Sequence, residues 1–286
     1  MVRNGGISPW EKNPTLRPIL ILPSISRVFM MKTHYAHSLL QRLIGLTLIL
    51  LIPHAFGRSV NVYVELDNLA VYQSIEQFNQ FLKSKGVFKK YQIEPFLHAY
   101  PLHVTLYLAD YPDKNIPQLV KRVAFLAKFW HAVELKTTSL YVTKGNYVML
   151  GIDLPHATQG GNSYLQQMSD ETVLQLNSLR DTNTPIPDWA MNNAVKRQAF
   201  SLYGSPNVFF EYTPHITLMA KPFKNTSEAA AFQEEMNALI KDYRQLKPLQ
   251  FKVSAIGIGY ADALGQITQP FAHFKLSLRT KEKPRV

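Results

Sequence analysis

The chain has 286 residues, of which 46% are apolar and 12% aromatic, as in globular proteins that bury a core. It contains no cysteine, which excludes disulfides and thiolate metal sites. The formal charge is +11 overall, and residues 58–286 hold 25 basic and 19 acidic residues. This excess favours anionic ligands, although ordinary surface charge explains it equally well.

The first 57 residues differ in character from the rest. Residues 1–30 show no periodicity and are interpreted as an upstream extension from a misassigned start. A basic stretch then precedes the apolar run Leu43–Ile52, and Ala55-Phe56-Gly57 offers small residues at positions −3 and −1 of a cleavage site. This order predicts a signal peptide at 31–57. The alternative is a retained membrane anchor, although the run is shorter than the roughly 20 apolar residues that span a bilayer.

If the signal is cleaved, the mature chain begins at or near Arg58. We then expect an exported protein, periplasmic or secreted, with no stable membrane association and in monomeric form.

The first half of this mature chain alternates strand and helix patterns. Asp67 or Asn68 is the expected N-cap of the first helix, and Gly86 its stop. Period-2 and helical spacings predict strands at Val60–Leu66, Leu102–Tyr107, Val133–Thr143 and Tyr147–Ile152, with a second helix that buries Leu119, Val123 and Trp130.

The second half follows a similar order. Ser163 and Gln166 form a capping box, Asp188 is expected to cap a helix that ends near Gly204, and Asn225 opens another. Strands are predicted at Val208–Met219, interrupted by Pro214, and at Leu249–Ile258 and Phe271–Leu278. The tail 280–286 is expected to be loose. The alternation of strands and helices predicts an α+β or α/β fold, with residues 58–279 forming one domain.

One four-residue phrase occurs in both halves, as His103-Val104-Thr105-Leu106 and as His215-Ile216-Thr217-Leu218. On a strand, side chains alternate between faces, so each histidine projects together with the threonine two residues on. Each phrase thus buries two aliphatic residues and presents an imidazole and a hydroxyl opposite. A single histidine in a strand is usually structural, but two copies in matching contexts favour one catalytic cleft.

The paired phrases resemble the signature of the 2H phosphoesterase superfamily, which includes 2′-5′ RNA ligases and cyclic nucleotide phosphodiesterases. Residues 203–207 and 212–215, which lead into the second phrase, also resemble the residues that precede the second motif in that superfamily. The resemblance implies a bilobal, pseudo-twofold form in which two antiparallel sheets flank a central cleft. It also implies catalysis without a metal or other cofactor.

These residues suit acid–base chemistry on a phosphodiester. One imidazole can take a proton from the attacking hydroxyl or water while the other gives one to the leaving oxygen. Thr105 and Thr217 can donate hydrogen bonds to the non-bridging oxygens. Tyr107, Lys221 and Tyr212 are weaker candidates for substrate binding, because the first two extend the motif faces by period 2 and a tyrosine can stack a base.

The leading hypothesis is therefore a metal-independent phosphoesterase that cleaves a 2′,3′-cyclic phosphate or a 2′-5′ phosphodiester of RNA or a small nucleotide. A non-catalytic exported protein that binds nucleotide or RNA in the same pocket is the alternative. A third interpretation makes both motifs parts of the core of an exported surface protein. The sequence does not identify the substrate, or which histidine is the acid.

Overall fold

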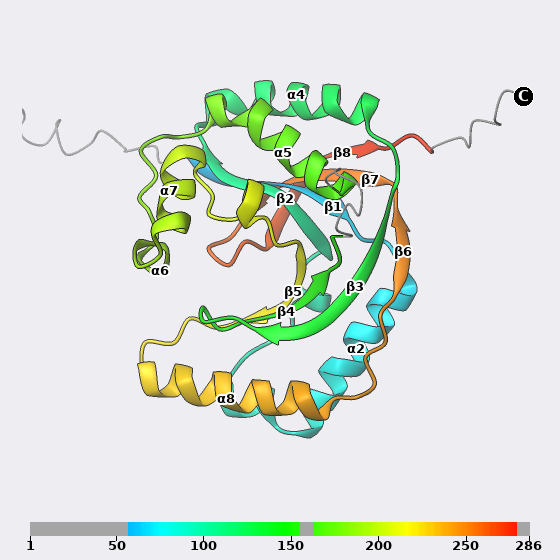
Figure 1. Ribbon diagram of the computed structural model, residues 1–286, viewed down its shortest axis with the longest axis vertical. Coiled ribbons are helices and arrows are strands. Elements are labelled where there is room, and N and C mark those ends of the chain that lie inside the picture. The colour runs from blue at the N-terminus through cyan, green and yellow to red at the C-terminus, as the bar shows by residue number, and fades with distance from the viewer. Residues whose placement is uncertain (1–56, 155–162, 279–286) are drawn as a thin grey trace, which may run out of the picture. The chain divides into compact units, whose positions relative to one another are not determined.

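A computed structural model describes residues 57–154 and 163–278, so the predicted extension, residues 31–56 of the predicted signal and the tail lie outside the described residues. The described strands form two antiparallel sheets of four (Figure 1). In sheet 1 the order is β2-β1-β7-β8, and in sheet 2 it is β5-β4-β3-β6. The predicted α+β class with two antiparallel sheets is confirmed.

Each sheet begins with one of the two histidine strands at its edge. Sheet 1 consists of β2 (His103–Tyr111), β1 (Arg58–Glu65), β7 (Ala255–Ala261) and β8 (Ile267–Lys275). Sheet 2 consists of β5 (His215–Ala220), β4 (Tyr147–Ile152), β3 (Val133–Val142) and β6 (Gln250–Val253). Because β1 and β2 share a sheet with β7 and β8, the first and last parts of the domain fold together.

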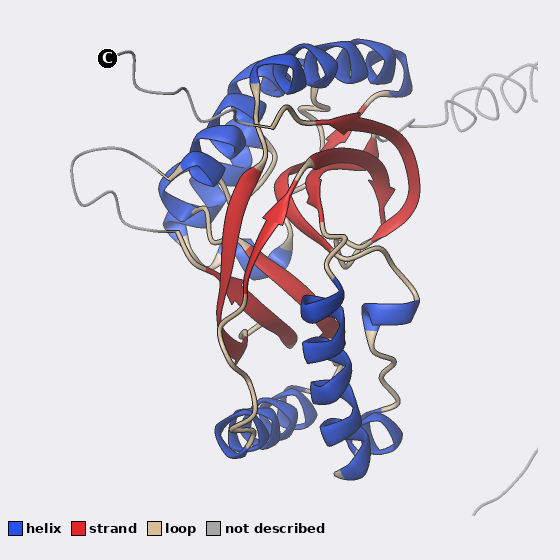
Figure 2. Ribbon diagram, turned by 90° about the vertical axis from the view of Figure 1, so that its right-hand side faces the viewer, coloured by secondary structure: helices blue, strands red, loops and turns tan. Residues whose placement is uncertain are grey.

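Helices cover the outer sides of the sheets (Figures 1 and 2). The helices α4 (Ile116–Phe129) and α5 (Tyr164–Leu176) lie over sheet 1, whereas α8 (Thr226–Asp242) lies against sheet 2 and meets α2 (Leu69–Ser84). The remaining helices are α3 (Val87–Tyr91), α6 (Asp188–Met191) and α7 (Ala194–Tyr203), with short 3-10 turns at η1 (Phe96–His98), η2 (Asp113–Asn115), η3 (Asn177–Leu179) and η4 (Phe209–Glu211).

The predicted helix starts are mostly correct. The side chain of Asn68 accepts a hydrogen bond from the Val71 amide at 3.1 Å, and Ser163 accepts one from the Gln166 amide at 3.2 Å. Asn225 likewise caps α8 through the Ser227 amide. These caps satisfy amides that the first helical turn leaves without partners.

Three predicted elements were wrong. The strand expected at Val208–Met219 begins only at His215, because η4 and Pro214 precede it. The strand expected at Leu249–Ile258 is divided at Ser254 between β6 in sheet 2 and β7 in sheet 1. The helix expected from Asp188 to Gly204 is two helices, because Asn193 caps α7 with its own side chain.

No helix within residues 57–154 and 163–278 has both the length and the apolar content that a membrane span requires.

Candidate active site

The two histidine motifs have the same local backbone. In sheet 1, Tyr63 pairs with Thr105 and the next residue, Val62, pairs with Tyr107, so Leu106 is an extra residue. In sheet 2 the pairing of β4 with β5 skips Leu218 in the same way. A bulge of this kind changes which face the following side chains occupy. Each motif therefore presents only its histidine and threonine on the shared face.

A backbone carbonyl orients each imidazole. The Nδ1 atom of His103 lies 3.0 Å from the carbonyl oxygen of Pro101, and that of His215 lies 2.7 Å from the carbonyl oxygen of Thr213. A carbonyl can only accept, so Nδ1 carries the proton in both rings. Both histidines are thus held in the tautomer that leaves the Nε2 lone pair for chemistry.

The surroundings of both rings disfavour their protonated form. His103 is 6% exposed, and burial lowers its pKa to about 4, with a further decrease from the positive charge that His215 can carry. Burial also lowers the pKa of His215, against the effect of the Thr213 carbonyl. The effect of His215 on His103 shows that the two sheets bring the imidazoles within electrostatic reach. An anionic phosphate between them would favour protonation and raise both pKa values.

Asn61, on β1, links the imidazole and the hydroxyl of the first motif. It is fully buried, and its Nδ2 atom lies 2.9 Å from Thr105 Oγ1, 3.5 Å from His103 Nε2 and 3.4 Å from the Gly265 carbonyl oxygen. Three acceptors around one atom identify it as the amide nitrogen. Because Thr105 accepts from Asn61, its own hydroxyl proton is free to be donated to a ligand.

Asn61 was missed in the sequence, although a signal for it exists. Val60, Val62 and Val64 alternate on one face of the predicted strand, which places Asn61 and Tyr63 on the opposite face. A buried amide on that face needed partners from another strand.

The ring of Tyr63 stands edge-on to the His103 imidazole, with 5.4 Å between the ring centroids and 63° between the planes. Gly257, its partner on β7, provides the space for this ring, because a β-carbon at that position would overlap the Tyr63 side chain. Burial raises the pKa of Tyr63 to about 12, so this residue is a neutral wall of the site.

The loop between β7 and β8 adds a carboxylate beside the first histidine. Asp262 accepts hydrogen bonds from the amides of Leu264 (2.9 Å) and Gln266 (2.8 Å) and is thereby fixed in place. Its charge opposes the lowering of the His103 pKa. It also adds to the effect of burial in raising the pKa values of two tyrosines, Tyr100 and Tyr147.

The structure brings the two histidines within electrostatic reach of each other, each with its threonine on the same face of its strand. His103, Thr105, His215 and Thr217 occupy matching positions on β2 and β5. Tyr212 is buried, and its hydroxyl donates to the Thr105 carbonyl oxygen at 2.9 Å, so it supports the first motif from the second.

Tyr107 does not lie on the face of the histidines, where it was predicted. The bulge at Leu106 turns Tyr107 into the core, where it is 1% exposed and its hydroxyl donates to the Tyr203 carbonyl. The Lys221 ammonium, beyond the end of β5, donates to the Tyr91 carbonyl.

Within residues 57–154 and 163–278, no group of three or more His, Cys, Asp or Glu side chains is arranged so that it could hold a metal ion. Among the other histidines, His98 contacts Tyr72 and Glu76, and His273 pairs with Glu65 at 2.8 Å. His156 lies outside the described residues.

Solved structures with a similar chain path come from several organisms. A Thermus thermophilus protein, TT0787, has a TM-score of 0.47 and 12% identity over 78% of this chain and all of its own. Escherichia coli LigT complexed with 3′-AMP has a TM-score of 0.43 and 13% identity, over 77% of this chain and 98% of its own. Kluyveromyces marxianus Usb1 with uridine monophosphate has a TM-score of 0.40 and 12% identity, over 78% and 98%.

The predicted resemblance extends to the chain path of these proteins, and at these identities and TM-scores it is a similarity of fold alone. No protein-family model matches the chain. No curated protein matches it either.

Proposed function

We propose that the protein is a metal-independent phosphoesterase that cleaves a 2′,3′-cyclic phosphate or a 2′-5′ phosphodiester of RNA or a small nucleotide. The observation that carries the proposal is the matched pair of imidazoles, His103 and His215. Each has Nδ1 hydrogen-bonded to a carbonyl, so that Nε2 carries the lone pair, and a threonine beside it on the same face. Two such groups supply the base and the acid that this reaction requires.

In the proposed reaction on a cyclic phosphate, His103 is the base. Its neutral Nε2 takes a proton from water as the water oxygen attacks phosphorus, opposite the leaving ribose oxygen. His215, protonated in the complex, gives its Nε2 proton to that oxygen as the P–O bond breaks. The product is a nucleoside monophosphate, and the proton on His103 returns to His215 through solvent.

The assignment of the two roles follows from Asn61. Its amide nitrogen points at His103 Nε2 and disfavours a proton there, and burial acts in the same direction. Within the described residues, no corresponding amide contacts Nε2 of His215. The Thr105 hydroxyl, which Asn61 leaves free to donate, and that of Thr217 would bind the non-bridging oxygens, where negative charge increases.

The test is a screen of the purified protein against nucleoside 2′,3′-cyclic phosphates, 2′-5′ dinucleotides and linear diesters. Replacing His103 or His215 by Ala should reduce the rate by about 10²- to 10⁴-fold. The double variant should lose little more, because both groups act in one transition state. His98→Ala is the matched control, because its side chain contacts Tyr72 and Glu76 instead.

Activity should survive EDTA, and a loss that a divalent ion restores would contradict the metal-free mechanism. Binding of nucleotides without turnover of any substrate would favour the non-catalytic alternative.

We further infer export, on the sequence pattern of residues 31–57 alone. The mature protein would be a monomer outside the cytoplasm, beginning near Arg58. Mass spectrometry of the protein from its native cells tests this, and an intact chain starting at Met1 would contradict it.

A further inference from the structure

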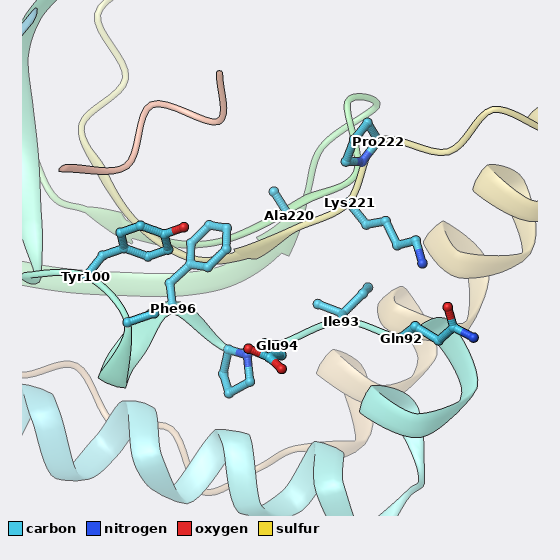
Figure 3. A pocket seen from close by; sticks show the side chains of 10 residues that line it. Gln92, Ile93, Glu94, Phe96, Tyr100, Ala220, Lys221 and Pro222 are labelled. Carbon is cyan, nitrogen blue, oxygen red and sulfur yellow. The ribbon is translucent and has the colours of Figure 1, made fainter. Parts of the chain in front are cut away.

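A pocket of about 350 Å³ lies between the segment 92–100, which leads into β2, and residues 220–222 at the end of β5 (Figure 3). Tyr100 and Phe96 stand at one end of it, and Lys221 and Gln92 at the other. Neither His103 nor His215 lines this pocket.

The pocket continues the face on which the second motif lies. Along β5, Thr217 pairs with Met149, Met219 with Val148 and Ala220 with Tyr147. Paired residues alternate between faces, so Ala220, which lines the pocket, faces the same side as Thr217 and His215.

At its other end the pocket reaches the first motif. Tyr100 lies three residues before His103, and the charge of Asp262 acts on both the Tyr100 hydroxyl and the His103 imidazole. A substrate whose phosphate lies between the two histidines could therefore place its adjoining group in this pocket.

The lining suits a flat heterocycle better than a phosphate. The rings of Phe96 and Tyr100 are 5.3 Å apart and nearly perpendicular, with Ile93 and Pro95 beside them. The ammonium group of Lys221 already donates to the Tyr91 carbonyl, whereas the carboxylate of Glu94 makes no ion pair with any described residue. An unpaired carboxylate repels an anion but accepts hydrogen bonds from an amino group.

We propose that this pocket binds the nucleobase of the substrate and prefers bases with an exocyclic amino group, such as cytosine, over uracil. The inference rests on the proposed phosphoesterase function, because the substrate's phosphate is what brings the base to this place. Tyr100 supplies a stacking surface, and Glu94 accepts a hydrogen bond from the amino group, as carboxylates do from cytosine N4.

The experiment compares kcat/KM of the full chain for three cyclic phosphates: those of cytidine, of uridine and of methyl riboside, which has no base. The cytidine substrate should exceed the methyl riboside by at least about tenfold, since stacking on one aromatic ring contributes that much. Tyr100→Leu should remove this advantage and Tyr100→Phe should keep it. Glu94→Ala should reduce the cytidine-to-uridine ratio by about 3- to 10-fold, as expected for one hydrogen bond.

A titration with cytidine 3′-phosphate adds a readout that needs no turnover. Its Kd should rise about tenfold in Tyr100→Leu and stay unchanged in Tyr100→Phe. Equal kcat/KM for substrates with and without a base, or a Kd that Tyr100→Leu leaves unchanged, would overturn the base pocket while leaving the phosphoesterase proposal intact. If no substrate is cleaved, the phosphoesterase proposal fails instead, and the titration still decides whether the pocket binds the base.

Discussion

Asn61→Asp tests the relation between this buried amide and His103 directly. The substitution keeps the shape of the side chain and replaces a donor by a carboxylate oxygen. At 3.5 Å from Nε2 the attraction between the two charges is about 5 kcal/mol at an effective dielectric constant of about 20. At 1.36 kcal/mol per pH unit, this attraction could raise the pKa of His103 by at most about three and a half units.

Burying the new carboxylate offsets part of that gain, so a rise of about one to three units is expected. The pKa of His103, about 4 in the natural protein, should therefore increase to about 5–7 in Asn61→Asp. Since a base must be unprotonated to act, the acidic limb of the kcat/KM profile should move to higher pH by the same amount. Thr105 would also turn its proton to the carboxylate, which should lower the maximum rate.

Two measurements check this result. The ring proton signals of His103 give its pKa by NMR titration, and the pH profile of kcat/KM gives the base in the free enzyme. Asn225→Asp is the matched control, because it makes the same change at the N-cap of α8, where aspartate also caps well. A folded Asn61→Asp protein whose His103 titrates within half a unit of the natural protein would refute the argument.

Other predictions concern stability and support of the site. His103 has a folded pKa of about 4 against 6.5 unfolded, so the unfolded chain binds more protons between these values and stability falls as pH decreases. Urea unfolding should show a loss of about 2–3 kcal/mol from this residue between pH 7 and 4.5, absent in His103→Gln. Tyr212→Phe leaves the Thr105 carbonyl without its hydroxyl partner and should lower the free energy of unfolding by about 1–3 kcal/mol, measured in the same way. Gly257→Ala would displace the ring of Tyr63 from His103, at a cost of about 1–3 kcal/mol, and a crystal structure with Tyr63 unmoved would contradict the close packing inferred here.

Features that depend on near neighbours in the chain were predictable. The cap at Asn68, the capping residue Ser163 and the turn that joins β3 to β4 all follow from a few adjacent residues, whose side chains bond to their own backbone. The pairing of each histidine with its threonine is equally local, since it requires only the alternation of a strand. The sequence by itself therefore determined both motifs, the positions of most helices and the α+β class.

Features that depend on pairing between distant strands were not predictable. Whether the stretch 249–258 is one strand or two depends on β3 and β1, which take its two parts into different sheets. The bulge that buries Tyr107 depends likewise on the register with β1. Contacts of this kind join residues far apart in the chain, and no local propensity encodes them.

The same reason explains the environment of the two motif histidines. Asn61 reaches His103 across 42 positions, and Asp262 approaches it from the far end of the domain. From the sequence alone, the two imidazoles would be expected to have the unperturbed pKa of histidine, about 6.5. Tertiary structure alone buried His103, half-buried His215, lowered the pKa values of both and placed the Asn61 amide against His103. Desolvation and charge act through space and not along the chain.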